Sequence, residues 1–427
     1  MRKVDPQLQA IRAAAKERFL AQKVATATAP SASTSNVALP AHLAHLSAEQ
    51  LNAPIGSLLA DAPEEYRPAK KAKITPDPNA IVIPQEKTSE IAALLAQQMA
   101  TPPRVLSWNI DGLDEVGGGQ GLAMRVLSIA RDIARYRPMA VLLQEVIPPA
   151  LELLSSNKVL GSCYDVLVPK NPPLPYYVAI LLDKKRLKRL GEAETVPFTS
   201  SQMGRQLLCV TAEAQDAPGK TLMLATAHLE STKDHATERK RQLLQSLRHL
   251  RRVVAGGKVT AALLGGDLNI RDDEVKAVLK DLGSEAEGFA DVWSFCGAPE
   301  TERWTWDTTQ NSNVGANFAC KTRFDRMIFM TPGVSDAPGV GLAAAKAKAK
   351  AKAKAVAHPR DGDGWRPTSI RLLGKEKVAG LGRFPSDHWG LLTEWTVTTV
   401  TSPTASIPRA VLPIPASDRR VVIDLDA

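Results

Sequence analysis

Short apolar runs recur at regular intervals from residue 104 onward, and their length separates them from the helical segments. The runs "RVLSWNI" (104–110), "MAVLLQEV" (139–146), "YYVAILLD" (176–183) and "KVTAALLGGDLN" (258–269) are continuously apolar over the length of a strand. They are bounded by polar, glycine or proline residues. Each is therefore predicted to be a buried strand.

Helical periodicity appears between these runs. In "AMRVLSIARDIARYRP", Leu127, Ala130, Ile133 and Ala134 recur at helical spacing, and Pro138 ends the pattern. A long basic helix is predicted at 235–254.

Other strands are paired by turn signals. The runs at 205–215 and 220–230 flank "DAPG", a hairpin signal, and "FDRMIFM" and "HWGLLTEWTV" are the last strands. Strands that both alternate with helices and pair by hairpins predict an α/β fold with mixed sheets covered by helices.

The N-terminal residues 1–103 have a different composition. "ATATAPSASTSNVALPAH" and "DAPEEYRPAKKAKITPDPN" are polar or proline-rich and cannot bury enough surface to offset the entropy of ordering. We expect a disordered basic tether in which short helices at 5–23 and 87–99 have no obligatory packing partner. The cluster "RPAKKAKI" (67–74) fits either a solvated linker or a nuclear import signal.

Two further segments lack a core pattern. "AAAKAKAKAKAKAVAHPRDGDG" repeats lysine at every second position, which predicts a disordered insertion at 335–366, with non-specific phosphate contact as a second reading. The tail 401–427 is proline-rich and is expected to be flexible.

Composition narrows the class of protein. The apolar fraction of 44% is that of a globular protein, and the formal charge of +9 suits a polyanionic partner without proving one. The four cysteines follow neither a zinc spacing nor a small disulfide framework, so reduced thiols in an intracellular protein are expected. No apolar run reaches the roughly 18 residues of a membrane span, so no membrane association is predicted.

Polar side chains follow the carboxyl ends of several predicted strands or precede the last one. They are Asn109, Glu145, His228, Asp267, Asn269, Asp387 and His388. Singly, each has an ordinary structural reading, such as Asn109 in a turn, Glu145 on the surface or Asp267 as a helix N-cap. Their repeated occurrence at strand ends instead predicts that they converge on one cleft.

The chemistry of this set is hard and oxygen-rich. Carboxylates without a cysteine or histidine cluster suit Mg²⁺ better than zinc. Two histidines and an additional aspartate beside a metal are what phosphoester hydrolysis needs. "GDLNIRDDE" does not make a calcium loop, because Arg271 replaces a ligand and Asp272 replaces the turn glycine. No Gly-x-Ser-x-Gly elbow for a serine nucleophile is present.

Six ordered blocks carry a family resemblance: "SWNIDGLD", "LLQEV", "AHLEST", "GGDLNIRD", "RFDRMIF" and "PSDHWGLL". Together they resemble the exonuclease–endonuclease–phosphatase (DNase I-like) superfamily over residues 104–397. The resemblance implies a four-layer α/β sandwich of two packed, mostly antiparallel mixed β-sheets flanked by helices, in a catalytic domain at 104–400. The Lys-Ala insertion has no counterpart in the family pattern.

The resemblance also implies catalytic roles. Glu145 would bind Mg²⁺ directly, with Asn109 and Asp387 completing the metal site. Asp267, helped by Asn269, would activate the attacking water. His388, held by Asp325, and His228 would donate to the scissile phosphate.

Within the superfamily, "TWDTTQNSNVGANFACKTRFDR" resembles the branch that acts on tyrosine-linked DNA. This implies a substrate-binding set consisting of Arg271, Ser231, Thr305, Trp306, Asn311, Asn313, Val314, Tyr176 and Tyr177. Arg271 would face the leaving tyrosine, Trp306 would stack on 5′ nucleotides, and Tyr176 and Tyr177 would add a wall.

The function implied is Mg²⁺-dependent hydrolysis (with Mn²⁺ as a substitute) of the bond between a topoisomerase II tyrosine and a 5′-DNA phosphate, in double-strand break repair. Two alternatives stay open: another DNase I-like phosphodiesterase acting on RNA 5′ ends or abasic sites, and a catalytically silent DNA- and SUMO-binding adaptor. The terminal "VVIDLD" resembles a SUMO-interacting motif with Val422, Ile423 and Leu425 as anchors. A nuclear location, with the cytoplasm as a second one, is expected.

Overall fold

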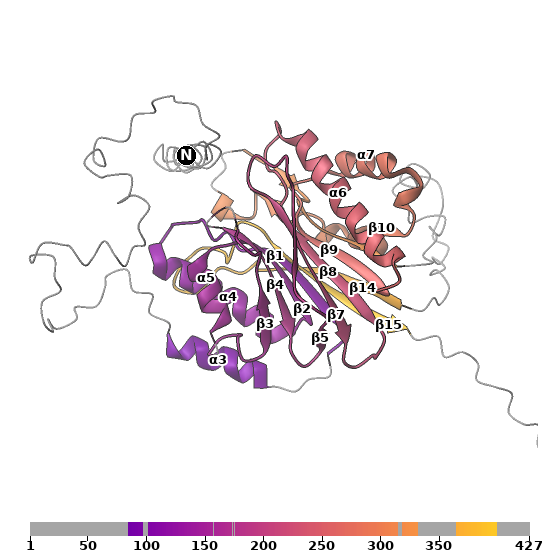
Figure 1. Ribbon diagram of the computed structural model, residues 1–427. Coiled ribbons are helices and arrows are strands. Elements are labelled where there is room, and N and C mark those ends of the chain that lie inside the picture. The colour runs from indigo at the N-terminus through magenta and orange to yellow at the C-terminus, as the bar shows by residue number, and fades with distance from the viewer. Residues whose placement is uncertain are drawn as a thin grey trace, which may run out of the picture.

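The structure is a stack of two β-sheets with helices on the outer faces (Figure 1). This computed structural model describes residues 84–96, 101–156, 158–172, 174, 176–314, 318–331 and 364–398. Neighbouring strands are mostly antiparallel, with one parallel pair in each sheet. The four-layer α/β arrangement expected from the sequence is confirmed.

The first sheet has six strands in the order β14-β15-β1-β2-β4-β3. Its strands are β1 (Arg104–Asn109), β2 (Ala140–Val146), β3 (Tyr164–Leu167), β4 (Tyr177–Asp183), β14 (Gly364–Leu373) and β15 (Gly390–Thr398). Strand β1 pairs parallel with β2 and antiparallel with β15. The ends of β1 and β2 therefore face the same edge of the sheet as the start of β15.

The second sheet has seven strands, ordered β10-β13-β9-β8-β7-β5 with β6 also paired to β7. Its strands are β5 (Leu187–Arg189), β6 (Glu194–Pro197), β7 (Gln206–Ala214), β8 (Thr221–Ala227), β9 (Ala261–Asp267), β10 (Phe289–Asp291) and β13 (Asp325–Met330). Strands β8 and β9 are parallel, and β13 is antiparallel to β9. A separate hairpin pairs β11 (Trp306–Asp307) with β12 (Lys321–Thr322).

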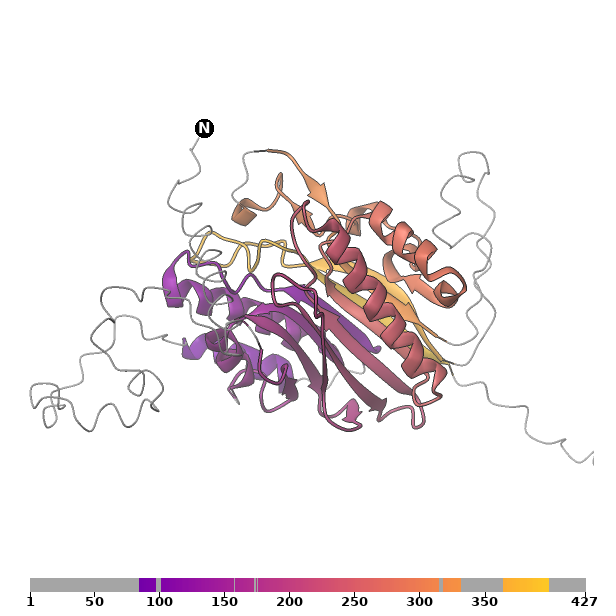
Figure 2. The ribbon, with the colours of Figure 1, turned by 45° about the horizontal axis from the view of Figure 1, so that its top comes forward.

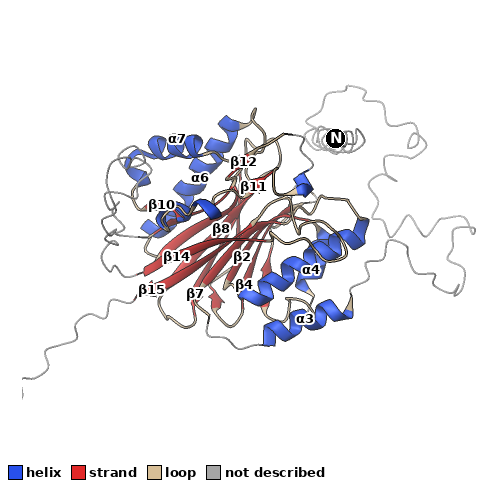
Figure 3. Cartoon of the chain, turned by 180° about the vertical axis from the view of Figure 1, so that it is seen from behind, coloured by secondary structure: helices blue, strands red, loops and turns tan. Residues whose placement is uncertain are grey.

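Helices cover both outer faces, as the view from behind makes clear (Figure 3). They are α3 (Gln85–Ala96), α4 (Gly118–Tyr136), α5 (Pro148–Ser155), α6 (Ala236–Ala255), α7 (Asp272–Leu282) and α8 (Val292–Phe295), with 3-10 turns at Gly283–Ala286, Glu300–Glu302 and Ser312–Val314. Helices α3, α4 and α5 lie on the side of the first sheet, and α6 runs along the second sheet with α7 beside it (Figure 2).

Side chains point alternately to the two faces of each sheet, and the apolar ones form three core layers. On β2, Leu142 packs into the core between the sheets, whereas Val141 and Leu143 pack beneath α4 and α5. A third core lies between the second sheet and helices α6 and α7. A buried hydrogen bond of 3.0 Å from Gln144 Nε2 on β2 to Thr226 Oγ1 on β8 ties the sheets together close to the strand ends. The edge where these strands end is therefore held rigidly.

Two expected boundaries need correction. Helix α3 packs on α4 through Ile91, which is almost fully buried, so residues 85–96 belong to the folded domain and not to a tether. Strand β14 begins at Gly364, inside the insertion expected at 335–366, because Trp365 is an apolar anchor buried between the sheets.

Several predictions fall outside the described residues. They are the disordered tether over 1–83 with its basic cluster at 67–74, the Lys-Ala insertion over 335–363, and the tail at 401–427 with Val422, Ile423 and Leu425. Among the helices that the structure does describe, none has the length and apolar character needed to cross a membrane.

Candidate active site

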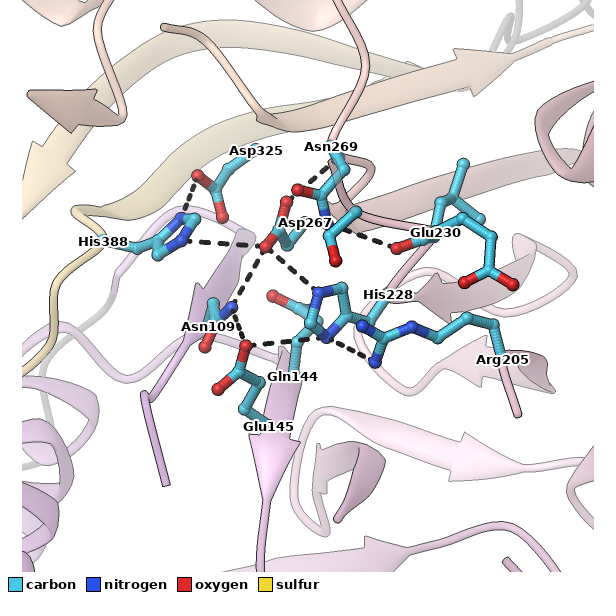
Figure 4. Close-up of polar contacts among 12 residues, drawn as sticks. Asn109, Gln144, Glu145, Arg205, His228, Glu230, Asp267, Asn269, Asp325 and His388 are labelled. Carbon is cyan, nitrogen blue, oxygen red and sulfur yellow. Dashed lines mark hydrogen bonds and ion pairs between the residues drawn. The ribbon is translucent and has the colours of Figure 1, made fainter. Parts of the chain in front are cut away.

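Polar side chains from both sheets converge at the edge where the central strands end (Figure 4). Asn109, the last residue of β1, donates from Nδ2 to Glu145 Oε1 (3.2 Å) and to Asp267 Oδ2 (3.1 Å). Asp267 ends β9, and its register partner on β13 is Asp325. Strand-terminal residues of the two sheets are thus in direct contact, as the prediction that they converge requires.

His388 is paired with Asp325. Its Nδ1 lies 2.8 Å from Asp325 Oδ2, and both side chains are buried. The charge of Asp325, with those of Asp387 and Asp267, outweighs burial and raises the pKa of His388 well above its usual value. The imidazole is therefore a cation at neutral pH, with Nδ1–H donating to Asp325 and Nε2–H facing Asp267 Oδ2 at 3.7 Å.

The ring of His228, in contrast, is neutral. Its Nδ1 lies 3.0 Å from Arg205 Nη1. Because a guanidinium can only donate, Nδ1 must accept, and the ring proton lies on Nε2, 3.4 Å from Asp267 Oδ2. Burial, followed by the charges of Arg205 and His388, lowers the pKa of His228 well below its usual value. One neutral and one cationic imidazole thus flank the same carboxylate.

Asp267 is almost fully buried between these groups. Burial raises the pKa of its carboxyl group to about 7, and the charges of Asp325 and Glu145 act in the same direction. The charge of His388 and the hydrogen bond from Asn109 oppose them. A carboxyl group that titrates near neutral pH can both accept and release a proton, as a general base must.

Three acidic residues gather beside Asn109. Burial raises the pKa of Asp111 well above its usual value, with repulsion from Asp387 and then Glu145 adding to it. Burial and then Asp387 also raise the pKa of Glu145. This mutual repulsion among Asp111, Glu145 and Asp387, which we call the acidic trio, is what a divalent cation would relieve, and its oxygen donors suit a hard metal.

The backbone brings the trio together at some conformational cost. Asp111 and Glu145 both adopt left-handed conformations, with φ of 49° and 54°. Gly112 lies so close to Glu145 that a Cβ built on it would come within 2.2 Å of the Glu145 carbonyl oxygen. The sequence analysis missed Asp111 as a site residue, although "NIDG" places it two positions after Asn109 and beside this glycine.

Among the described residues, the set with ligand atoms all within 4.8 Å of one another is a different one: Asp267, Asp325 and His388. The histidine of this set has no free ring nitrogen for a metal, because its Nδ1–H donates to Asp325 and the ring is protonated. A protonated imidazole cannot bind a metal, so the acidic trio is the better candidate for a metal site.

Asn269, predicted to be catalytic, and Ser231, predicted to bind substrate, both contact neighbouring protein groups. Asn269 donates its backbone N–H to Asp267 Oδ1 (3.0 Å) and its side-chain Nδ2 to the Leu229 carbonyl (3.2 Å), so it orients Asp267. Ser231 lies near the site with its Oγ 3.3 Å from Met203 Sδ.

Two aromatic surfaces lie near the strand ends. Arg271 is exposed and stacks over Phe324, whose ring lies 5.8 Å from that of Trp306. On the other side, Tyr176 lies under the Arg205 guanidinium, and Tyr177 lines the same cavity together with His228. Trp306 and the two tyrosines are partly exposed, as a surface role requires.

Four residues predicted to line the groove have little exposed surface. Thr305, Asn311, Asn313 and Val314 are buried. Asn311 donates to the Ser386 carbonyl (3.0 Å) and Asn313 to the Phe384 carbonyl (2.8 Å). These side chains support the corner that carries Asp387 and His388, because unpaired backbone carbonyls there would be costly to bury.

Sequence reasoning also missed the residues that orient the site. Glu230 is fully buried, and its Oε1 accepts from Ser201 Oγ (2.9 Å) and from the backbone N–H groups of Gln202 (2.5 Å) and Met203 (3.0 Å). The Ser201 Oγ in turn accepts from Arg205 N (2.7 Å). This carboxylate therefore fixes the loop that delivers Arg205 to His228. No local motif signals that role.

The chain is similar in sequence to curated proteins that share one name. The chain is 35% identical to tyrosyl-DNA phosphodiesterase 2 of Homo sapiens over 330 residues, which is 77% of this chain and 76% of that protein. It is 34% identical to the Xenopus tropicalis protein of the same name over 317 residues, covering 74% of this chain and 72% of the relative. No protein-family model matches the chain.

Solved structures give the same result. A crystal structure of Danio rerio TDP2 complexed with single-strand DNA product superposes with a TM-score of 0.54 at 31% identity, covering 69% of this chain and 99% of that one. Truncated Caenorhabditis elegans TDP2 superposes with a TM-score of 0.53 at 28% identity, covering 69% of this chain and 96% of that one.

Proposed function

Because this chain belongs to the tyrosyl-DNA phosphodiesterase 2 family, we propose that it is a Mg²⁺-dependent hydrolase of 5′-tyrosyl-DNA. It would cleave the bond between a topoisomerase II tyrosine and the 5′-DNA phosphate, leave a 5′ phosphate, and act in double-strand break repair. One observation carries the proposal: the buried Asp267 carboxylate lies 3.4 Å from His228 Nε2 and 3.7 Å from His388 Nε2, and these two rings are paired with Arg205 and Asp325.

The two histidines supply different donors to one phosphate. His388 offers a charged Nε2–H, which stabilises the negative charge that accumulates on the non-bridging phosphate oxygens in the transition state. His228 offers a neutral Nε2–H, because Arg205 occupies its Nδ1. Asp267, within 4 Å of both rings, is placed to accept a proton from the attacking water.

The acidic trio fits a divalent metal, and its all-oxygen donors favour Mg²⁺, for which Mn²⁺ could substitute. Glu145, Asp387 and Asp111 would hold the metal, with Asn109 contributing by orienting Glu145. When bound, the metal would neutralise charge on the phosphate oxygens during displacement.

The aromatic surfaces divide the substrate between them. Trp306 and Phe324 offer ring faces on which bases of a single strand can stack, next to the cation of Arg271. Arg271, exposed beside Phe324, would face the leaving tyrosine, and Tyr176 and Tyr177 would add a wall next to His228. A phenol has a pKa of about 10, so it leaves more readily than an alkoxide and needs less acid assistance.

The biological setting is also part of the proposal. Hydrolysis of topoisomerase II remnants would place the protein in the nucleus, with a cytoplasmic pool as a second location. The basic cluster at 67–74 and the terminal "VVIDLD" support import and SUMO binding by their sequence alone.

A single-stranded DNA with a 5′-phosphotyrosine, incubated with the protein and Mg²⁺ and then with EDTA, tests the reaction. We expect metal-dependent release of tyrosine and a 5′-phosphate end. Asp267→Asn should abolish turnover, whereas the control Asp273→Asn, which changes an exposed acid on α7, should not. Near wild-type turnover by Asp267→Asn, or cleavage only of an abasic or RNA substrate, would contradict the proposal.

A further inference from the structure

A buried arginine lies beneath the acidic trio. Arg125 is on α4 and has no exposed surface. Its Nη1 donates to the carbonyls of Ile110 and Pro385, each at 3.1 Å. Its Nη2 donates to the carbonyls of Asp111 (3.0 Å) and Asp114 (3.1 Å). The guanidinium therefore satisfies four backbone carbonyls at once.

These carbonyls belong to two segments that are far apart in the sequence. Residues 110–114 follow β1 and include Asp111, whereas Pro385 lies two positions before Asp387 in the corner that precedes β15. The planar fork of a guanidinium fixes the direction of each hydrogen bond. Arg125 thereby sets the separation of the two segments, each of which carries one acid of the trio.

The same segments are joined a second time through Asp114. Its Oδ2 accepts from Arg383 Nη2 at 2.6 Å and lies 3.7 Å from Arg125 Nε. Arg383 belongs to the corner that carries Asp387, and Asp114 belongs to the loop that carries Asp111. Arg125, Asp114 and Arg383 therefore form one network that connects the loop after β1 to the corner before β15. Arg125 is its fully buried member.

Arg125 also holds the strained part of the loop. The left-handed Asp111 donates its N–H to Asn109 Oδ1 (3.0 Å) while its carbonyl accepts from Arg125. Without the guanidinium, the Asp111 carbonyl would lose this partner, and the loop could relax toward an unstrained conformation.

We propose that Arg125 is a positioning residue that sets the divalent-metal affinity of the site by fixing Asp111 and Asp387 around Glu145. This inference rests on the proposed function, because it takes the acidic trio to be the metal site. Arg125 itself does not touch the metal or the substrate. Its effect reaches the metal through the backbone of the two segments.

The chain offers a matched control on the other side of the site. Arg239 on α6 is equally buried and donates to the carbonyls of Glu230 (3.0 Å) and Thr232 (2.8 Å) and to Glu274 (2.7 Å). It supports the loop after His228 and has no contact with the segments of the trio. Loss of either guanidinium removes the same kind of buried hydrogen bonds, so the two variants should lose comparable thermal stability.

The experiment compares Arg125→Met, Arg125→Lys and Arg239→Met in the full chain. Dissociation constants for Mn²⁺ and Mg²⁺ are measured by calorimetry and by electron paramagnetic resonance of free Mn²⁺, without substrate, and melting temperatures are recorded in parallel. Loss of a residue that orients metal ligands typically weakens binding about 10- to 100-fold, which is the loss expected for Arg125→Met. Arg125→Lys should be intermediate, because one nitrogen cannot bridge all four carbonyls, and Arg239→Met should bind metal within about twofold of wild type.

Wild-type metal affinity in Arg125→Met would overturn the inference. If that variant does not fold, the same result with Arg125→Lys would overturn it, and so would an equal loss of affinity in Arg239→Met. Failure of the proposed function looks different, because in that case the wild-type protein itself would not bind Mn²⁺ or Mg²⁺.

Discussion

Asp325→Asn isolates the charge that keeps His388 protonated. Asparagine has nearly the same shape, and its carbonyl oxygen can still accept from His388 Nδ1, so the hydrogen bond survives while the charge is lost. The present N···O distance is 2.8 Å between two buried side chains. The change therefore tests electrostatics with little effect on packing.

The size of the effect follows from this geometry. An opposite charge within about 4–6 Å shifts a pKa by about 1–3 units, and one unit corresponds to about 1.4 kcal/mol. Asp267 and Asp387 remain at 3.7 and 3.9 Å from His388 Nε2 and keep part of the effect. We expect the pKa of His388 to fall in Asp325→Asn, because the carboxylate charge closest to the ring is lost.

The sign of the pH dependence is fixed by the direction of the wild-type shift. The raised pKa of His388 keeps the ring charged until the pH rises past it, so loss of this charge should lower activity on the alkaline side. Protonation of Asp267, whose pKa is about 7, should lower activity on the acid side. In Asp325→Asn the alkaline limb should move to lower pH, because the imidazolium loses its nearest negative charge.

The assay is the pH dependence of kcat on the 5′-phosphotyrosyl oligonucleotide at saturating metal. Asp183→Asn is the control, because Asp183 is a buried carboxylate paired with Arg137 (3.1 Å) away from the site. An alkaline limb that stays in place in Asp325→Asn, or that moves equally in Asp183→Asn, would refute the assignment of His388 as the charged donor.

Two other changes have defined outcomes. Gly112→Ala would place a Cβ 2.2 Å from the Glu145 carbonyl oxygen. We therefore expect a loss of about 1–3 kcal/mol in the free energy of unfolding, together with weaker metal binding. The control Gly256→Ala, at a helix end with right-handed backbone, should change neither property. Arg205→Met should release His228 from its fixed tautomer and lower kcat by roughly 10- to 100-fold, which corresponds to the loss of one hydrogen bond from a charged group. If the ¹⁵N chemical shifts of the His228 ring stayed unchanged in this variant, Arg205 would not be what fixes the tautomer.

The polar residues that follow the predicted strands located much of the site from the sequence. Asn109, Glu145 and Asp267 close apolar runs whose period and length are local properties, and the structure brings all three into contact. The backbone partners of Asn311 and Asn313 could not be predicted for a related reason. Asn311 and Asn313 belong to a family block, but a block does not tell whether an amide faces substrate or a backbone carbonyl.

The sequence by itself determined the α/β class, the order of strands and helices, and the residue types at the strand ends, because hydrophobic period and strand termination depend on neighbouring residues alone. The tertiary structure decided the charge of each histidine and the membership of the acidic trio. His388 is charged because Asp325 lies 63 positions away in the sequence but 2.8 Å away in space. His228 is neutral because it is buried and because Arg205 reaches its Nδ1. Burial and the distance between charges set these properties, and both arise only when segments remote in the sequence pack together.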